Sequence, residues 1–306
     1  MPRIHVIGAL VYDLVFNVPD WIEPNRAVHA SRVTLSPGGK ALNQAAAARL
    51  LGADVALIGA VGDDLFGAQM LHELRSIGVN IDHVITHDSA RTSLASIVVK
   101  DMVPGFIGAP DASRKLGEGD IDRALRNLQK DDLLLIDFEI PQELVQYALT
   151  RAKNAGAATV VNPAPFFTRD AFVFGYLHLV DVIIPNKFEA QLIAGEDIDA
   201  PDVLARRLLD MGVKQVVMTL GEDGCVLYEG NRKLVQSAFA VAVVDTTGAS
   251  DAFVGAYALA MVNGWSGKRA LKFAAAAAGL ACSKHGTMSS LPRLSDVDLL
   301  LRSGAK

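Results

Sequence analysis

The chain has 306 residues, 51% of them hydrophobic, which is enough apolar material for one large α/β domain or two small ones. Its formal net charge is −5 and it contains no Lys/Arg-rich run, which argues against a nucleic-acid-binding or anionic-membrane surface. The two cysteines, Cys225 and Cys282, are far apart and support neither a disulfide framework nor a Cys/His metal site. We expect small-molecule ligands and a reducing, cytoplasmic location.

The first residues, up to about position 11, form a short apolar segment. It lacks a basic amino-terminal region and a small-residue cleavage site, so we interpret it as a first strand rather than a signal peptide. The alanine-rich stretches near Ala45 and Ala274 are interrupted by polar residues and do not reach membrane-spanning length. We therefore expect no membrane partner.

Short β-branched runs then alternate with helical patterns along most of the chain. The predicted strands are residues 4–7, 55–58, 133–136, 159–161, 182–184 and 216–219. The predicted helices are 40–51, 65–76, 121–127, 143–154, 188–194 and 201–211, followed by three consecutive helices at 252–262, 268–283 and 294–302. This alternation predicts an α/β fold with a mostly parallel sheet covered on both faces. We interpret residues 1–306 as a single domain without repeats or linkers.

Two segments, approximately 13–36 and 91–107, depart from this alternation because they have turn-separated β-like patterns without a helix between them. We interpret them as a small β-structure that projects from the main sheet as a lid, and the alternative is a pair of ordinary surface hairpins. The loops after the parallel strands would meet at the carboxyl edge of the sheet, where such sheets bind ligands. These loops are 137–141, 162–165, 185–189 and 221–224.

The most informative segment is Asp-Thr-Thr-Gly-Ala-Ser-Asp at 245–251, between a β-type run at 239–244 and a helix that begins near Ala252. Small residues at a helix start let backbone N–H groups face an anion, and the carboxylate of Asp251 beside them suits phosphoryl transfer to a hydroxyl. The same residue types are also ordinary helix caps, so a purely structural role stays open. A second glycine cluster at 36–43 also opens a helix, and two such starts favour two ligands.

Five segments agree, in order, with the motifs of one family. They are Gly-Gly-Lys-Ala-Leu-Asn-Gln-Ala-Ala-Ala at 38–47 with its continuation at 51–67, Asn-Pro-Ala-Pro at 162–165, Pro-Asn-Lys-Phe-Glu at 185–189, Thr-Leu-Gly-Glu-Asp-Gly at 219–224, and Asp-Thr-Thr-Gly-Ala-Ser-Asp-Ala-Phe at 245–253. Over essentially its whole length the chain resembles the ribokinase-like (PfkB-type) sugar and nucleoside kinases. The resemblance implies a three-layer α/β/α fold with a β lid and an ATP- and Mg²⁺-dependent kinase.

The resemblance implies that Asp251 is the base that accepts the proton of the attacking hydroxyl. A carboxylate suits this role because positioning matters more than basicity in a loose phosphoryl-transfer transition state. The N–H groups of Gly248, Ala249 and Ser250 would bind the transferring phosphoryl group. Ser250 replaces the family's usual glycine. Either its backbone adopts a helix-start conformation and the N–H groups stay aligned, or the chain is a catalytically impaired sugar-binding regulatory protein.

A nucleotide and metal site is implied at the later loops. Asn186 and Glu189 would hold Mg²⁺ and phosphate through water, since this ion prefers hard oxygen ligands and retained waters; taken alone, the pair is a helix cap. ATP would lie on the loop at 219–224, with the adenine against 275–279, and the implied nucleotide-binding residues are Asn186, Thr219, Gly221, Gly224 and Gly248. A K⁺ ion is implied beside the carboxyl-terminal motif, surrounded by Asp245, Thr247, Ala281, Lys284, Gly286 and Ser290.

For the phosphoryl acceptor, the resemblance implies a set of hydroxyl-binding groups: Asp13, Gly38, Gly39, Lys40, Asn43, Glu139 and Asp251. Val11 stands where ribokinases carry an Asn that bonds the sugar, which favours a less polar ligand such as a nucleoside or a modified sugar. We expect phosphorylation of a hydroxymethyl group of a small sugar, with a nucleoside kinase of the same family as the alternative. Exposed lid strands can also pair between subunits, which would give a homodimer through the lid.

Overall fold

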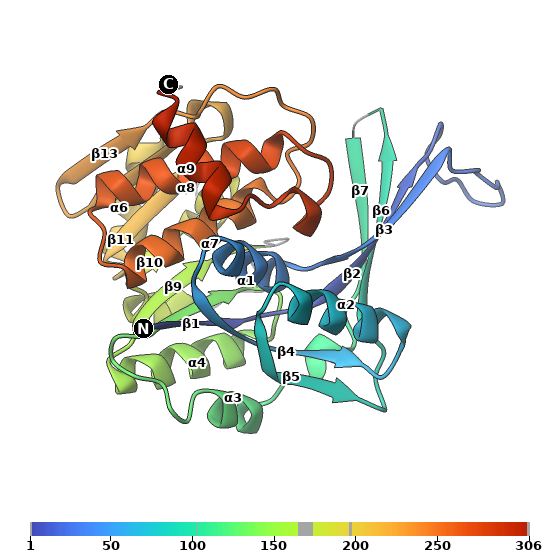
Figure 1. Ribbon diagram of the computed structural model, residues 1–306, viewed down its shortest axis with the longest axis horizontal. Helices are drawn as coiled ribbons and strands as arrows, with labels where there is room; N and C mark the ends of the chain where they lie inside the picture. The colour runs from blue at the N-terminus through green and yellow to red at the C-terminus, as the bar shows by residue number, and fades with distance from the viewer. Residues whose placement is uncertain (1, 102, 165–173, 196–197, 305–306) are drawn as a thin grey trace.

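The computed structural model describes residues 2–101, 103–164, 174–195 and 198–304. Within these residues a nine-stranded sheet has helices on both faces, and a separate four-stranded sheet projects from one side (Figure 1). This is the three-layer α/β/α arrangement with a β lid that the sequence predicts. No helix of the described residues is long and apolar enough to cross a bilayer.

The large sheet is mostly parallel. Its strands, in spatial order, are β13 (Arg232–Gln236), β12 (Cys225–Glu229), β11 (Gln215–Thr219), β10 (Val182–Ile183), β9 (Ala158–Asn162), β8 (Leu133–Asp137), β1 (Arg3–Ile7), β4 (Asp54–Gly62) and β5 (Asn80–His87). All neighbours from β11 to β5 pair in parallel, whereas β12 and β13 continue the sheet as an antiparallel hairpin. The parallel strands therefore end at one edge, as the ligand-binding loops require.

Each face of the sheet has its own apolar core. Successive side chains of a strand point to opposite faces, so Ile4 and Val6 belong to one core and Ile7 to the other. The first core is covered by α1 (Lys40–Leu50), α2 (Leu65–Ser76), α7 (Ala249–Val262), α8 (Gly267–Cys282) and α9 (Leu294–Arg302). The second is covered by α3 (Glu118–Ala124), α4 (Gln142–Ala155), α5 (Lys187–Ala194) and α6 (Pro201–Asp210).

Helices α1 and α7 approach each other unusually closely. An ideal Cβ on Gly255 of α7 would lie 2.7 Å from the backbone oxygen of Gln44 on α1, so only a glycine fits between the two backbones. The residues of α1 from Ala41 to Ala48 are all buried, and most are alanine. This packing brings the side chains of α1 to the first turn of α7, where Asp251 lies.

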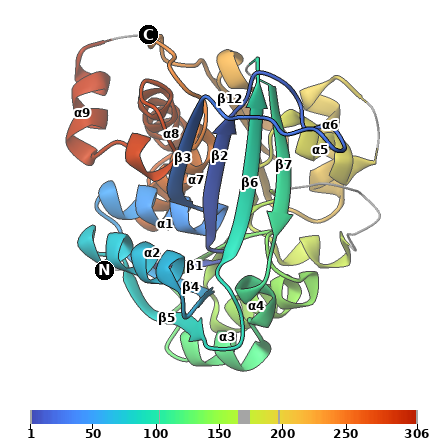
Figure 2. The same ribbon diagram turned by 90° about the vertical axis from the view of Figure 1, so that its right-hand side faces the viewer.

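The lid is one continuous sheet. Its strands are β3 (Arg32–Gly38), β2 (Val11–Asn17), β6 (Ser93–Lys100) and β7 (Val103–Ala109), in that spatial order, and Figure 2 shows them side by side. The two predicted lid segments correspond to its two antiparallel hairpins, β2–β3 and β6–β7. Parallel pairing of β2 with β6 joins them, which distinguishes the lid from two independent surface hairpins.

The segment before α7 differs from its prediction. The sequence predicts a β-type run at 239–244, whereas the structure has no strand there. An ideal Cβ on Gly279 of α8 would lie 3.5 Å from the Phe239 Cβ and 3.6 Å from the Val241 Cγ1, so these side chains cover a helix. Phe239 and Val241 therefore pack on α8 without a strand partner. Helix α7 also begins at Ala249 rather than near Ala252.

Candidate active site

A cavity of about 790 Å³ lies between the lid and the carboxyl ends of the central strands. The start of α1, the loop after β8, the start of α7 and the strands β2, β6 and β7 all contribute to its walls. The predicted site residues on these walls are Asp13, Gly39, Lys40, Asn43, Glu139, Thr247, Gly248, Ser250 and Asp251. The structure therefore brings most of the predicted acceptor-binding and catalytic groups together in one cavity, whereas Gly38 and Ala249 do not line it.

The start of α1 depends on glycine. Gly39 has a φ of 87°, and an ideal Cβ there would lie 2.6 Å from the backbone oxygen of Ala9. The chain between β1 and β2 thus lies directly against the first turn of α1. The free N–H of Lys40 in this turn donates to the Glu139 Oε2 at 2.8 Å, which fixes this carboxylate at the positive end of the helix.

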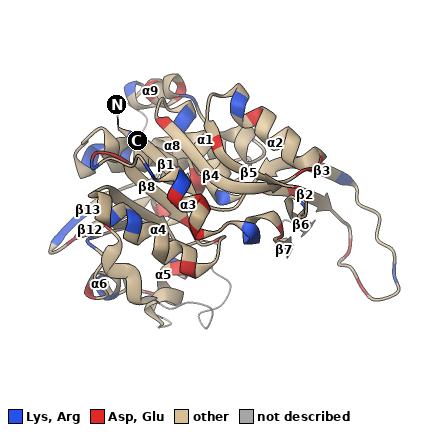
Figure 3. Ribbon diagram, turned by 90° about the horizontal axis from the view of Figure 1, so that it is seen from below, with Lys and Arg blue, Asp and Glu red and all other residues tan. Residues whose placement is uncertain are grey.

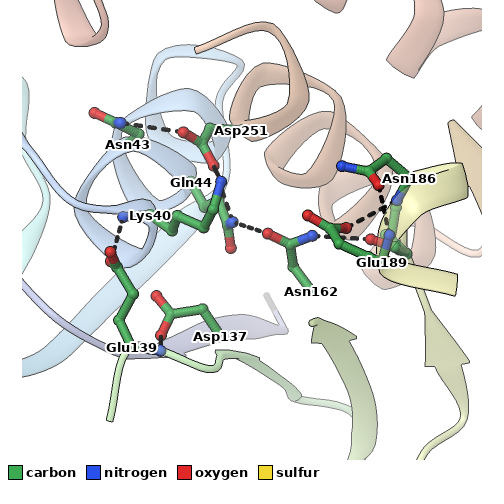
Figure 4. A network of polar contacts seen from close by, with 10 residues as sticks. Lys40, Asn43, Gln44, Asp137, Glu139, Asn162, Asn186, Glu189 and Asp251 are labelled. Carbon is green, nitrogen blue, oxygen red and sulfur yellow. Dashed lines mark hydrogen bonds and ion pairs between the residues drawn. The ribbon is translucent and has the colours of Figure 1, made fainter. Parts of the chain in front are cut away.

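Asp251 is 5% exposed and held by three side chains of α1 (Figure 4). The Asn43 Nδ2 donates to its Oδ2 at 3.1 Å, and the Gln44 Nε2 donates to its Oδ1 at 3.1 Å. The Lys40 Nζ lies 3.9 Å from the Oδ1. Because both carboxylate oxygens accept N–H groups, Asp251 is presented to the cavity as an oriented hydrogen-bond acceptor.

The first turn of α7 keeps free N–H groups beside Asp251. Gly248 is the N-cap and has a φ of 80°, a left-handed conformation that favours glycine. Ser250 is the second residue of α7 and is not among the described residues with positive φ, so it causes no backbone strain. The N–H of Ala249 donates to the Thr246 oxygen at 3.2 Å. The position that needs glycine in this motif is therefore 248 and not 250.

The cavity concentrates acidic groups around one lysine. Burial, followed by the nearby charge of Asp251, raises the pKa of Asp13 to about 7. Desolvation also raises the pKa of Glu139 to about 7, although its bond to Lys40 favours the charged form. Desolvation opposes charge on Lys40, but Asp251, Glu139 and further carboxylates outweigh this and raise the pKa of the ammonium above its ordinary value. Lys40 is therefore a fixed positive charge in this acidic site.

Asn186 and Glu189 form the helix cap that their spacing allows. The Glu189 N–H donates to the Asn186 Oδ1 and the Asn186 N–H donates to the Glu189 Oε2, both at 2.8 Å. This reciprocal pair uses one oxygen of each side chain and leaves the Glu189 Oε1 without a partner among these bonds. A carboxylate oxygen is the type of ligand that fits Mg²⁺ held through its hydration shell.

The predicted nucleotide loop lies at the same sheet edge but outside the cavity walls. Thr219 ends β11 and forms a β-bridge with Asn186, which aligns the two loops. Gly221 and Gly224 have φ values of 61° and 92°. An ideal Cβ on Gly224 would lie 2.1 Å from the Gln236 oxygen, so this glycine is also required for the adjoining hairpin. Pro165 of the predicted Asn-Pro-Ala-Pro loop lies outside the described residues.

The residues predicted to surround K⁺ gather beside α7. The Asp245 Oδ1 accepts the N–H and hydroxyl of Thr247, and its Oδ2 accepts the Gly286 N–H at 3.1 Å. An ideal Cβ on Gly248 would lie 3.6 Å from the Oγ of Ser290, which is fully buried. The oxygen of Ala281 accepts the Lys284 N–H at 3.3 Å. Carboxylate, carbonyl and hydroxyl oxygens near one helix start fit a monovalent cation.

Sequence reasoning gave no role to Gln44 or Asn162, which the structure places in the same network as Asp251 (Figure 4). The sequence does contain a signal for Gln44. Asn43 and Gln44 lie three and four residues after Lys40, so the three side chains share one face of α1. Thr287, which lines the cavity and donates to the Pro37 oxygen at 3.1 Å, gave no comparable signal.

The comparisons with known proteins agree with this fold. The chain matches the model of the pfkB family carbohydrate kinases over residues 1–294. The ribokinase of Haemophilus influenzae is 31% identical over 291 residues, covering 94% of each chain. The deoxyribokinase of Salmonella typhi is 30% identical over 295 residues, covering 95% of this chain and 96% of that protein.

The fold also agrees with that of a solved structure. The structure of Arabidopsis thaliana ribokinase complexed with ribose and ATP superimposes with a TM-score of 0.90 and 28% identity, covering 98% of this chain and 99% of the other. The fold and the family match define a phosphotransferase with an alcohol group as acceptor. The chain belongs to the pfkB family of carbohydrate kinases.

Proposed function

We propose that this protein is an ATP- and Mg²⁺-dependent kinase that transfers the γ-phosphoryl group of ATP to a hydroxymethyl group of a small sugar. The observation that carries the proposal is the placement of Asp251, buried at the first turn of α7 on the cavity wall with both carboxylate oxygens accepting N–H groups. Family membership and the ribokinase structure complexed with ribose and ATP support the same reaction.

Asp251 acts as the general base. Its carboxylate accepts the proton of the acceptor hydroxyl while the hydroxyl oxygen forms a bond to the γ-phosphorus of ATP. The bond between the γ-phosphorus and the bridging β-phosphate oxygen breaks, ADP leaves, and the proton is later released to water. The donors on α1 hold the carboxylate in place, which matters more than its basicity in this reaction.

The first turn of α7 stabilises the transferring group. The N–H groups of Gly248, Ala249 and Ser250 point from the positive end of a 14-residue helix and bind the phosphoryl oxygens. The N–H of Ala249 is shared with the Thr246 oxygen at 3.2 Å, so the other two donors carry most of this interaction. Lys40 adds a positive charge beside the same oxygens.

The acceptor lies between the lid and α1. Asp13, Asn43 and Glu139 accept or donate hydrogen bonds to its hydroxyls, and the glycine pair at 38–39 lets the backbone approach the ring. Val11 and the lid residues Ala95 and Ile97 give the remaining wall an apolar character. This wall favours nucleosides and modified sugars as a second class of acceptor.

The nucleotide and its ions occupy the neighbouring loops. The phosphates and ribose of ATP lie on Thr219, Gly221 and Gly224, and the adenine lies against 275–279. Asn186 and Glu189 would hold Mg²⁺ through water, and this ion would neutralise phosphate charge. A K⁺ ion would be held beside α7 by its set of surrounding residues, Asp245, Thr247, Ala281, Lys284, Gly286 and Ser290.

The lid closes over the acceptor and joins two subunits. Val33, Leu35, Phe106 and Ile107 are large apolar side chains on lid strands and are each more than half exposed. Pairing of two lids would cover them in a homodimer, which small-angle scattering distinguishes from a monomer.

Elsewhere, acidic and basic residues are interspersed (Figure 3), which fits small-molecule rather than nucleic-acid ligands. Two free cysteines fit a cytoplasmic location.

A coupled assay of ADP formation over a panel of sugars and nucleosides tests this proposal. We expect acceptor-dependent ADP formation that requires Mg²⁺, with a free hydroxymethyl group on every active acceptor. Acceptor-dependent thermal stabilisation without ADP formation for any compound would instead identify a sugar-binding regulatory protein. Preference for nucleosides over sugars would select the nucleoside kinase.

A further inference from the structure

Gln44 is a fully buried amide beneath the cavity. Its side chain lies on α1, is 0% exposed and does not line the cavity walls. It therefore cannot contact the acceptor, unlike its neighbour Asn43. Nevertheless its Nε2 donates two hydrogen bonds, to the Asn162 Oδ1 at 2.9 Å and to the Asp251 Oδ1 at 3.1 Å (Figure 4). These bonds use both hydrogens of the amide.

The orientation of this amide follows from a backbone carbonyl. The Ile184 oxygen can only accept, so the Asn162 side chain must direct its Nδ2 to it, at 2.8 Å. The Asn162 Oδ1 then faces Gln44, which must present its Nε2 rather than its Oε1. The second hydrogen of that Nε2 is thereby directed at Asp251. Asn162 and Gln44 thus form a chain of hydrogen bonds from the Ile184 oxygen to the Asp251 carboxylate.

The cost of this arrangement indicates that the donor matters. The Gln44 Oε1 is buried without a partner among the described residues. A buried polar atom without a partner costs about 1–3 kcal/mol, so an apolar side chain of similar volume would serve packing alone at least as well. We therefore infer that Gln44 does more than fill the space between α1, β9 and α7.

We propose that Gln44 is a positioning residue that fixes the catalytic orientation of Asp251 from the main-chain carbonyl of Ile184, through Asn162. This inference rests on the proposed function, in which Asp251 is the base. Ile184 lies two residues before Asn186. The segment that carries the proposed phosphate- and Mg²⁺-binding residues therefore also sets the direction of the base. Gln44 thereby aligns the proton acceptor with the phosphoryl donor without touching either substrate.

The test compares Gln44→Met with the wild type and with Thr159→Val. Gln44→Met keeps the volume but removes both donors. We expect kcat to fall about 10- to 100-fold, as for loss of one hydrogen bond to a charged group, with little change in KM for ATP or acceptor. Thr159→Val removes a buried hydroxyl that donates to the Leu179 oxygen, away from the cavity, and should lower Tm with kcat unchanged.

A second variant, Gln44→Glu, keeps both the polarity and the size of the side chain. Its carboxyl must be protonated to donate to Asp251, so we expect partial activity at low pH that declines as the pH rises. This decline keeps the inference testable if Gln44→Met does not fold.

Unchanged kcat and pH profiles in these variants, with only Tm lowered as in Thr159→Val, would overturn the role of Gln44 while leaving the kinase intact. A wild type that forms no ADP with any acceptor would overturn the proposed function, and the role of Gln44 with it. An active wild type separates the two results.

Discussion

The carboxylate of Asp13 occupies the space that a side chain at Gly38 would need. An ideal Cβ on Gly38 would lie 2.1 Å from the Asp13 Oδ2. The two residues are diagonal neighbours across the β2–β3 hairpin, where Val11 pairs with Gly38 and Asp13 with Ser36. Glycine at 38 therefore permits the orientation of Asp13 toward the cavity.

Gly38→Ala should consequently weaken acceptor binding. The added methyl group displaces the Asp13 carboxylate, and loss of one hydrogen bond to a charged group should raise the acceptor KM roughly tenfold or more. KM for ATP should change little. Gly119→Ala on α3 is the matched control, because its ideal Cβ would meet only the Arg123 Nη1, at 3.7 Å. Equal kinetics for both variants would remove Asp13 from the acceptor site.

The pH dependence follows from Asp13 and Glu139, whose pKa values are each raised to about 7. Below pH 7 these carboxyls become protonated and lose acceptor capacity, so KM for the sugar should increase as the pH falls. Stability has the opposite sign, because a folded-state pKa above the unfolded value contributes stability at low pH that is lost as the pH rises toward 7.

Steady-state kinetics from about pH 5.5 to about pH 8 checks this prediction, together with Tm of the unliganded protein. Asp13→Asn should reduce both trends, because one of the two titrating groups is gone. An acceptor KM that is constant over this range in the wild type would refute it.

Ser250→Gly tests whether the serine impairs the phosphoryl site. Ser250 is helical in α7, so restoring glycine relieves no strain and should leave kcat within about threefold. Glycine inside a helix costs about 0.5–1 kcal/mol, so Tm should fall slightly. An increase in kcat of orders of magnitude would mean that the serine distorts the site.

Glu189→Gln tests the proposed Mg²⁺ element. The amide can keep the cap to the Asn186 N–H through its oxygen, so the helix start should stay folded. Loss of the negative charge should raise the Mg²⁺ concentration needed for half-maximal rate, by roughly tenfold or more. Glu118→Gln, in the first turn of α3, is the control. The same Mg²⁺ requirement in both variants would exclude Glu189 from the metal site.

The parallel sheet and the lid could be predicted because their signals are local. Runs such as 133–136 are continuously apolar, as strands buried on both faces must be, and the lid hairpins have no helix between them. The edge strand at 80–87 carries polar and charged residues and gave no such signal. The pattern at 239–244 predicts a strand that does not form, because Phe239 and Val241 pack on α8 instead.

The acceptor site followed from the sequence only through resemblance, since its members are up to 238 positions apart, from Asp13 to Asp251. Tertiary packing of α1 against α7 at Gly255 decides that Asn43 and Gln44 meet Asp251. No periodicity in either helix specifies this contact. The burial that raises the pKa of Asp13 is likewise a property of the tertiary structure.

Turnover and acceptor binding in Asp251→Asn test the central claim most directly, with Asp210→Asn at the exposed end of α6 as the control. Removing the proton acceptor while keeping the shape should lower kcat by orders of magnitude, and calorimetry should show acceptor affinity close to that of the wild type. Turnover equal to that of the control would contradict the assignment of Asp251 as the base.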